Sequence, residues 1–93
     1  MEKTIIILSG GFDPVHKGHV KMFQAAKDYP VEVIVGLNSD SWLTRKKGKP
    51  FMDWKERKFI LDAMSCIDHV YSFNDDDDSA CDLIKKVFEQ NKD

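Results

Sequence analysis

Apolar and polar positions follow two different rhythms along the chain, and these predict strands in some segments and helices in others. Runs of mostly apolar residues at positions 4–9, 31–37 and 67–73 have the length and β-branched content of buried strands. At 17–28 and 79–90, apolar residues recur every three or four positions, as on one face of a helix. A strand, a helix and a second strand in succession form a βαβ unit, so we expect the sheet to be parallel.

Capping and helix-breaking residues set the expected limits of the other elements. Pro30 ends the first helix, because proline disfavours helical backbone in the residue before it. Ser39 begins a Ser-Asp-Ser cap of a short helix, and residues 45–50 are expected to form a basic, glycine-containing loop. Asp53 caps a further helix, and Glu56 completes a capping box there.

The last two long helices are expected to reach the core through their apolar faces. These faces comprise Phe59, Ile60, Ala63 and Met64 in the helix after Asp53, and Leu83, Ile84, Val87 and Phe88 in the last helix. The order of elements predicts a Rossmann-like, three-layer α/β/α fold with a parallel sheet, half of a doubly wound arrangement. We expect one domain over residues 1–93.

Length and charge restrict the possible partners. The chain has 93 residues, of which 42% are hydrophobic and 32% charged, an ordinary globular balance. A domain of this size buries less than about two thirds of its unfolded surface, so its stability margin is thin unless it oligomerises. The net charge is −2, so we expect no general attraction to nucleic acid or to a membrane, and any anion has to be bound locally.

The cysteines and the amino-terminal residues indicate a cytoplasmic protein. Cys66 and Cys81 form neither a C-x-x-C pair nor a disulfide framework, and we expect both to be reduced thiols. The apolar run after Lys3 is too short for a signal peptide and far too short to span a bilayer.

The stretch between the first strand and the first helix contains the candidate chemistry. Gly10 and Gly11 form a turn there, directly after the strand. A strand, a glycine turn and a helix N-terminus make a phosphate site, because the first helical N–H groups point outward and the helix dipole favours an anion. His16 and His19 place two imidazoles on one side of the first helical turn, and Gly18 between them leaves room for a ligand.

Paired imidazoles at a phosphate site favour nucleotidyl transfer. Imidazole donates hydrogen bonds and can carry positive charge near neutral pH, so a pair can stabilise charge growing on the α-phosphate of a nucleoside triphosphate under in-line attack. The spacing alone leaves two alternatives, a chance placement on the surface and half of a metal site. The stretch has neither the lysine and hydroxyl residue of a Walker loop nor the G-x-G-x-x-G spacing of dinucleotide sites.

The same stretch resembles a family signature. Gly11-Phe12-Asp13 and His16-Lys17-Gly18-His19 match the G-x-F-D-x-x-H-x-G-H pattern of the cytidylyltransferase-like nucleotidyltransferases of the HIGH superfamily. The resemblance covers residues 3 to about 85 and is nearest to glycerol-3-phosphate cytidylyltransferases and heptose 1-phosphate adenylyltransferase domains. It implies transfer of CMP or AMP from CTP or ATP to a small phosphorylated acceptor, such as a polyol or sugar phosphate, with release of pyrophosphate.

The resemblance also implies a role for each site residue. His16 and His19 would stabilise the transition state, while Lys46 and Arg57 would neutralise the departing pyrophosphate. Asp13 would lie by the phosphates as a ligand of Mg²⁺. The residues expected to bind the nucleotide are Gly10, Gly11, Phe12, Asp13, Gly18 and Lys47.

Structural roles remain open for several of these side chains. Asp13 could only stabilise its own turn as an Asx residue, and lysines in a loop at 45–50 could simply be solvated. Arg57 could pair with Asp53 or Glu56 on its own helix.

The chain also departs from the family pattern. Full-length relatives carry a further strand with a G-x-D-type turn and a carboxy-terminal Ile-Ser-Ser/Thr-Thr-x-x-Arg segment, which no residue up to Asp93 supplies. We therefore expect a domain that lacks the family's carboxy-terminal strands, is truncated at that end, and leaves one edge of its first strand unpaired. Ser65 replaces an arginine found in many cytidylyl enzymes, which leaves CTP and ATP both open.

An unpaired strand edge also suggests how the chain associates. We expect a homo-oligomer or pairing with another chain along the first strand. The alternative to an enzyme is a non-catalytic nucleotide-binding or assembly module that uses this edge.

Overall fold

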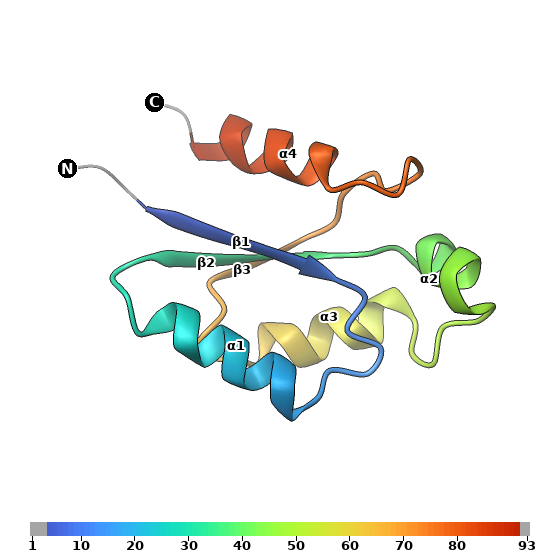
Figure 1. The fold of residues 1–93 in the computed structure, drawn as a ribbon, viewed down its shortest axis with the longest axis horizontal. Helices are drawn as coiled ribbons and strands as arrows, with labels where there is room; N and C mark the ends of the chain where they lie inside the picture. Colours follow the sequence, from blue (N-terminus) through green and yellow to red (C-terminus); the bar gives the residue numbers. More distant parts are fainter. Residues whose placement is uncertain (1–3, 92–93) are drawn as a thin grey trace.

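The computed structural model describes residues 4–91, which form a parallel sheet with helices on both faces. Strands β1 (Ile5–Gly10), β2 (Glu32–Leu37) and β3 (His69–Tyr71) lie in the order β1-β2-β3. The helices are α1 (Lys17–Lys27), α2 (Asp40–Lys47), α3 (Trp54–Asp62) and α4 (Cys81–Asn91). Helices α1 and α3 cover one face and α4 the other, while α2 lies beyond the carboxyl ends of the strands (Figure 1). The predicted Rossmann-like, three-layer architecture is confirmed.

Parallel pairing brings the loops after the three strands to one edge of the sheet. Gly10 at the end of β1 is in register with Leu37 at the end of β2, and Gly36 is in register with Tyr71 at the end of β3. The N–H of Asn38 extends the ladder by donating to the carbonyl of Gly10 at 2.9 Å. Ligands of open α/β sheets bind at this edge, so the segments after β1, β2 and β3 surround the expected ligand position.

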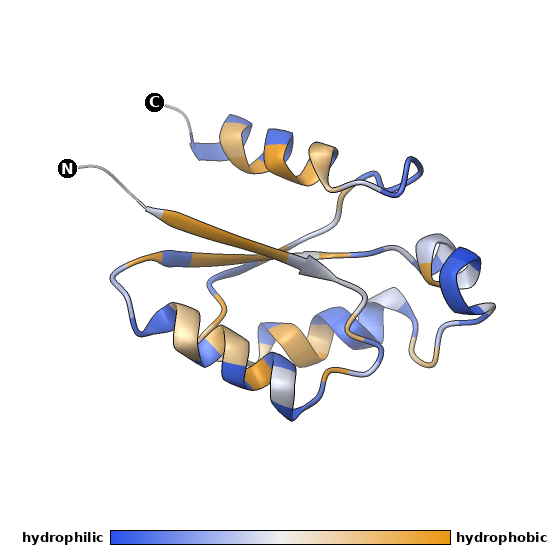
Figure 2. Ribbon diagram, in the orientation of Figure 1, coloured by the Kyte–Doolittle hydropathy of each residue, from blue (hydrophilic) through white to orange (hydrophobic). Residues whose placement is uncertain are grey.

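The buried strand β2 divides the core into two layers. Its alternate residues Val33, Val35 and Leu37 pack with Phe23 and Leu61 beneath α1 and α3. Ile34 faces the other way, into a cluster with Phe73, Leu83 and Val87 under α4. Apolar residues predominate in β1 and β2 and recur along the helices on both sides of the sheet (Figure 2).

A glycine in β2 determines how closely α4 packs. A Cβ atom at Gly36 would lie 2.2 Å from a methyl carbon of Leu83, far inside van der Waals contact. The side chain of Leu83 therefore rests on the bare backbone of the central strand.

Two expectations about element limits need correction. The segment 45–50 is not all loop, because α2 continues through Lys47 and ends at Gly48, whose φ of 88° lies in the left-handed region that favours glycine. The third strand, His69–Tyr71, is shorter than the expected range 67–73, although Ile67 and Phe73 at the two ends of that range are still buried.

The expected apolar faces of α3 and α4 are only partly correct. On α3 the fully enclosed residues are Arg57 and Leu61, whereas Phe59 is 78% exposed. On α4, Leu83 and Val87 are buried as expected, but Ile84 and Phe88 are 57% and 67% exposed. The reason on α3 is that a buried arginine with polar partners occupies the inner face.

Cys66 and Cys81 are both free thiols. None of the helices between residues 4 and 91 has the length and apolar character needed to cross a bilayer.

Candidate functional site

His16 and His19 build the amino-terminal cap of α1 between them. His16 is the N-cap residue, and its Nδ1 accepts a hydrogen bond from the N–H of Gly18 at 3.1 Å. Nδ1 of His19 in turn accepts from the main-chain N–H of His16 at 3.1 Å. This is the reciprocal arrangement of a capping box, with two imidazoles in place of the usual hydroxyl and carboxyl groups.

The capping bonds determine which ring nitrogen carries the proton. A neutral imidazole has one N–H donor and one acceptor nitrogen. Because Nδ1 accepts in both rings, the proton of each neutral ring lies on Nε2. The two histidines therefore present two N–H donors at the start of a helix whose dipole already favours an anion.

The environment of His19 favours the neutral form of its ring. Partial burial lowers the pKa of His19, and the neighbouring His16 lowers it further by charge repulsion. Beneath it, the ring of Phe12 contacts His19 edge-on, with centroids 4.9 Å apart. Phe12 has a φ of 49°, and this left-handed backbone turns its side chain into the core below the histidine pair.

Gly18 has a steric role that the sequence did not reveal. A Cβ atom there would lie 3.0 Å from Cε1 and 3.2 Å from Nδ1 of His16. The N–H of Gly18 can therefore approach the His16 ring closely, which the capping bond requires. Gly11 is similarly confined, because a Cβ there would lie 2.8 Å from Leu43 on α2.

Asp13 joins the loop after β1 to the segment between α2 and α3. Its buried carboxylate accepts from the main-chain N–H of Met52 at 2.7 Å and of Phe51 at 2.5 Å. Lys47 Nζ pairs with the same carboxylate at 2.7 Å and donates to the Asp13 carbonyl at 2.8 Å. Burial raises the pKa of Asp13, but the bonds from Lys47, Phe51 and Met52 outweigh it and hold the pKa below its usual value.

These contacts do not fit a magnesium ligand at Asp13. Both carboxylate oxygens already accept N–H donors, and a lysine ammonium occupies the position where a cation would bind. Within residues 4–91, moreover, no group of three or more His, Cys, Asp or Glu side chains is arranged to hold a metal ion. The carboxylate of Asp13 is therefore engaged within the protein and not placed to hold Mg²⁺.

Arg57 lies at the centre of the carboxyl edge and is only 1% exposed. Its Nη1 donates to the carbonyls of Gly11 and Asn38, each at 2.8 Å. Its Nε donates to the Met52 carbonyl at 3.0 Å, and its Nη2 pairs with Asp40 at 2.6 Å. The guanidinium thus joins the segments after β1 and β2 to its own helix; its salt-bridge partner is Asp40 rather than Asp53 or Glu56.

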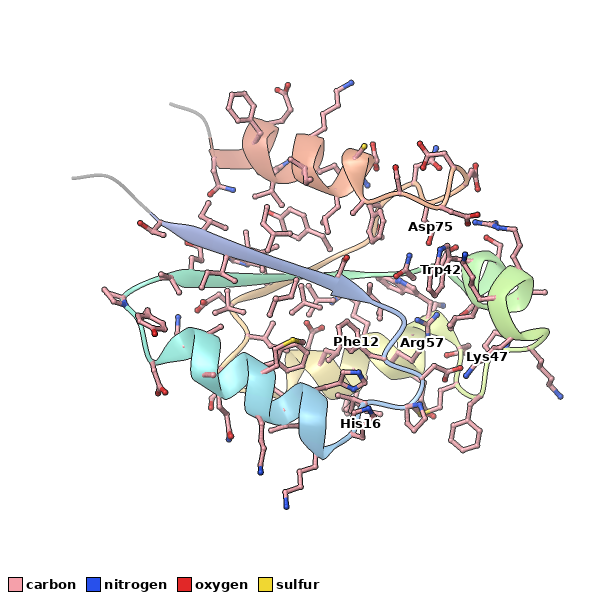
Figure 3. The ribbon with its side chains drawn as sticks, viewed as in Figure 1. Phe12, His16, Trp42, Lys47, Arg57 and Asp75 are labelled. Carbon is pink, nitrogen blue, oxygen red and sulfur yellow. The ribbon has the colours of Figure 1, made fainter. Side chains whose placement is uncertain are left out.

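Lys46 lies on the exposed surface of α2. Its Nζ lies 5.6 Å from the ring centroid of Trp42, one helical turn earlier, as a surface cation–π contact. Figure 3 shows Trp42, Lys47, Arg57 and Asp75 at the α2 end of the sheet, with His16 at the start of α1. Basic and imidazole side chains from α1, α2 and α3 thus lie along one edge of the sheet.

Asn38 and Asp75 belong to this edge, and neither was identified from the sequence. Both are buried, and Asn38 Nδ2 donates to Asp75 Oδ2 at 3.0 Å. Asn38 directly follows a buried strand, which is a signal for a ligand-site loop. Asp75 begins a run of four aspartates, a pattern that predicts only a turn.

Comparison with known proteins identifies the family. The sequence model of the family described as cytidylyltransferase-like matches residues 7–89. The chain belongs to this family. The match includes the glycine turn, both histidines and Arg57, so the resemblance seen in the sequence is confirmed.

Several curated relatives carry the name bifunctional protein HldE. The chain is 46% identical over 76 residues to the protein of Geobacter metallireducens and 43% identical over 77 residues to that of Helicobacter pylori. These alignments cover 80% and 81% of this cytidylyltransferase-like chain, but 16% and 17% of the relatives. The chain thus spans about a sixth of the length of the curated relatives that it matches.

A solved structure has the same fold. The lipopolysaccharide core biosynthesis protein from Thermoplasma volcanium matches with a TM-score of 0.75 over 95% of this chain and 68% of its own, at 22% sequence identity. At this identity the likeness supports the cytidylyltransferase-like fold and nothing finer.

Proposed function

We propose that this cytidylyltransferase-like chain is a nucleotidyltransferase domain. A phosphate oxygen of a small acceptor attacks the α-phosphorus of ATP or CTP, and the bond from that phosphorus to the α,β-bridging oxygen breaks. The products are a nucleoside diphosphate ester of the acceptor and pyrophosphate. The observation that carries the proposal is the histidine capping box at the start of α1, in which each Nδ1 accepts a main-chain N–H, so that Nε2 of each neutral ring is the donor.

Each group has a distinct task in this reaction. His16 and His19 donate hydrogen bonds to the α-phosphate as its negative charge grows, and the N-terminus of α1 adds its dipole. Lys46 on α2 supplies positive charge to the leaving pyrophosphate. Magnesium enters with the nucleoside triphosphate as part of the substrate. The main chain of Gly10, Gly11 and Phe12 lines the phosphate site, and Gly18 leaves its mouth open.

We assign Arg57 and Lys47 roles that differ from direct phosphate contacts. Four N–H groups of Arg57 donate to protein oxygens, so its task is to hold the glycine turn against the loop after β2. Lys47 is paired with Asp13, and this pair holds the segment between α2 and α3 over the turn. Both residues then shape the nucleotide site from behind.

The resemblance to heptose 1-phosphate adenylyltransferase domains supports a sugar phosphate as the acceptor class. The relatives named bifunctional protein HldE, at 46% and 43% identity, are consistent with it. A sugar phosphate offers the phosphate oxygen that the reaction needs. The base of the nucleotide is left to experiment, because no described contact distinguishes adenine from cytosine.

Calorimetric titration of the full chain tests the nucleotide site. ATP and CTP, each with Mg²⁺, are titrated into the wild type, His16→Ala, His19→Ala and the matched control His69→Ala, whose ring pairs with Glu32 on the sheet. We expect one nucleotide to bind, with its affinity lost in the first two variants and kept in the third. Pyrophosphate release with sugar and polyol phosphates then tests turnover. Equal nucleotide binding by wild type and both site variants would refute the role of the histidines.

A second function is favoured by the outer edge of β1. In the described part of the chain β1 ends the sheet, so this edge has no strand partner. Beside it runs a groove lined by Ile5, Ile7, Ile84, Val87, Phe88 and Asn91. We propose that a second copy of the chain pairs with this edge in antiparallel fashion. The lining carries no charge, so a two-fold interface brings no like charges together and covers the exposed isoleucine and phenylalanine of both copies.

A further inference from the structure

Asp75 is a buried carboxylate that the proposed reaction does not use. It lies between β3 and α4 and is 2% exposed. Its Oδ2 accepts from Asn38 Nδ2 at 3.0 Å and from the N–H of Ser39 at 2.8 Å, and its Oδ1 accepts from the Ser39 hydroxyl at 2.7 Å. All three donors belong to the turn after β2. One side chain of the β3–α4 loop therefore fixes the loop of the neighbouring strand.

Ser39 extends this contact to α2. Its hydroxyl has one proton, which it donates to Asp75, while its oxygen accepts from the N–H of Trp42 at 3.0 Å as the N-cap of the helix. The hydroxyl is thus held in the rotamer that caps α2. The placement of α2, and of Lys46 near its other end, follows from the position of Asp75.

Asn38 extends the contact in the opposite direction, to the glycine turn. Its carbonyl accepts from Arg57 Nη1 at 2.8 Å, and the same nitrogen donates to the carbonyl of Gly11 at 2.8 Å. The path from Asp75 through Asn38 and Arg57 to Gly11 is continuous and lies within the protein. In such a path each bond depends on the orientation of the next.

We infer that Asp75 is a positioning residue, which fixes the turn after β2 so that the glycine turn and the lysine-bearing helix α2 keep the orientation that a triphosphate requires. This inference rests on the proposed nucleotidyl transfer. Burial raises the pKa of Asp75, but the hydrogen bonds from Ser39 and Asn38 outweigh it and keep the pKa below its usual value. The group is therefore a carboxylate at neutral pH, and its three hydrogen bonds are charge-assisted.

Amide hydrogen exchange tests the positioning without any nucleotide. In Asp75→Asn, an NH₂ group of similar size replaces one acceptor oxygen, so it faces either the two N–H donors at Oδ2 or the Ser39 hydroxyl at Oδ1. We expect two amides to exchange about tenfold faster, that of Trp42, which donates to Ser39 Oγ, and that of Asn38, which donates to the Gly10 carbonyl. The control Asp76→Asn, which alters an exposed neighbour of the same charge, should leave both rates unchanged. Ser39→Ala, which keeps the carboxylate, should accelerate Trp42 alone. Wild-type rates at both amides in a folded Asp75→Asn would overturn the inference.

Nucleotide titration then tests the consequence for binding. The comparison variant is Ile67→Ala, which removes a core contact in the opposite layer and lowers stability without touching the polar path. Measured well below its unfolding temperature, Asp75→Asn should bind Mg²⁺-ATP or Mg²⁺-CTP about tenfold more weakly than the wild type, while Ile67→Ala binds normally. Equal loss in both variants would mean a purely structural role and would also overturn the inference. If the wild type binds no nucleotide, the proposed function fails, and the exchange rates alone decide the role of Asp75.

Discussion

The imidazole rings of His16 and His19 stack with their centroids 3.8 Å apart and their planes inclined by 26°. Stacking and capping hold the two rings in one arrangement, with each Nδ1 bonded to the main chain and each Nε2 left for a ligand. The same atoms that stabilise the start of α1 thus set the direction of the candidate phosphate donors.

Asparagine at position 16 separates capping from phosphate binding. Its side-chain oxygen can replace Nδ1 as the acceptor, and asparagine is among the best N-cap residues, but it places no donor where Nε2 lies. We expect the free energy of unfolding of His16→Asn to lie within about 0.5 kcal/mol of the wild-type value, whereas that of His16→Ala should be lower by about 1 kcal/mol. Both should lose at least about tenfold in nucleotide affinity. Chemical denaturation and calorimetry measure the two effects, and normal binding by His16→Asn would contradict the donor role.

The pKa of His19 makes the stability of the fold depend on pH. Its folded value is lowered from 6.5, so the unfolded chain binds a proton that the folded chain resists, and stability falls as pH drops below about 6.5. In His19→Gln the amide can still complete the capping box but does not titrate. The free energy of unfolding should therefore change less between pH 7.5 and 5.5 in this variant. His69→Gln is the control, and an unchanged pH dependence in His19→Gln would refute the assignment.

The buried carboxylate of Asp13 should contribute more to the free energy of unfolding than a surface ion pair does. Asp13→Asn leaves Lys47 and one amide poorly paired, so we expect a loss of about 1–3 kcal/mol in the free energy of unfolding. Lys58→Met, which breaks the exposed pair with Asp62, should cost less than about 1 kcal/mol. Thermal and urea denaturation would compare the two, and a similar small loss in both would show that the Asp13 contacts add little.

The bonding pattern of Arg57 predicts that lysine cannot replace it. Lysine keeps the charge but not the fork that reaches Gly11, Asn38 and Met52 at once. We expect Arg57→Lys to lose about 3 kcal/mol or more, because buried carbonyls are left without donors. Denaturation measures this, with Arg45→Lys as an exposed control that contacts the Asp75 carbonyl. Equal stability of the two variants would contradict the central position of Arg57.

Pairing along β1 should depend on the exposed side chains of α4. We expect the wild type to form dimers whose proportion rises with concentration, and Ile84→Lys or Phe88→Lys to remain monomeric. Phe59→Lys, which replaces a phenylalanine of the opposite layer that is more exposed than Phe88, should dimerise as the wild type does. Sedimentation velocity distinguishes these outcomes. A monomeric wild type, or dimers unaffected by both α4 substitutions, would exclude this interface.

The sequence predicted the parts of the fold that depend on local pattern. The apolar runs that became β1 and β2 and the caps at Ser39 and Asp53 are local signals, and all appear where expected. The length of α2 was missed because basic residues at 45–50 suggested a loop, although Lys46 and Lys47 are good helix formers and Gly48 is a good helix end.

The misjudged residues are those whose environment depends on distant partners. Arg57 is buried because carbonyls after β1 and β2 and the carboxylate of Asp40 surround it, and no spacing within its own helix reveals them. Phe88 fits a helical stripe, yet the described elements leave it exposed. Asp75 lies 37 residues from Asn38, so a contact between them could be inferred only once the strand order was known. The histidine pair was identified because its chemistry lies within four consecutive residues.

Gly36 couples the packing of α4 against the sheet to the candidate site at the carboxyl edge of the strands. Because the strand has no side chain there, Leu83 sets the height of α4 above the sheet, and the loop that contains Asp75 enters α4 at that height. Even alanine at position 36 would push α4 away from the sheet. The Asp75 carboxylate would then move away from the turn after β2, to which it is hydrogen-bonded. Adding one methyl group to the buried strand would thus disturb the candidate site at the carboxyl edge of the sheet without altering any residue exposed there.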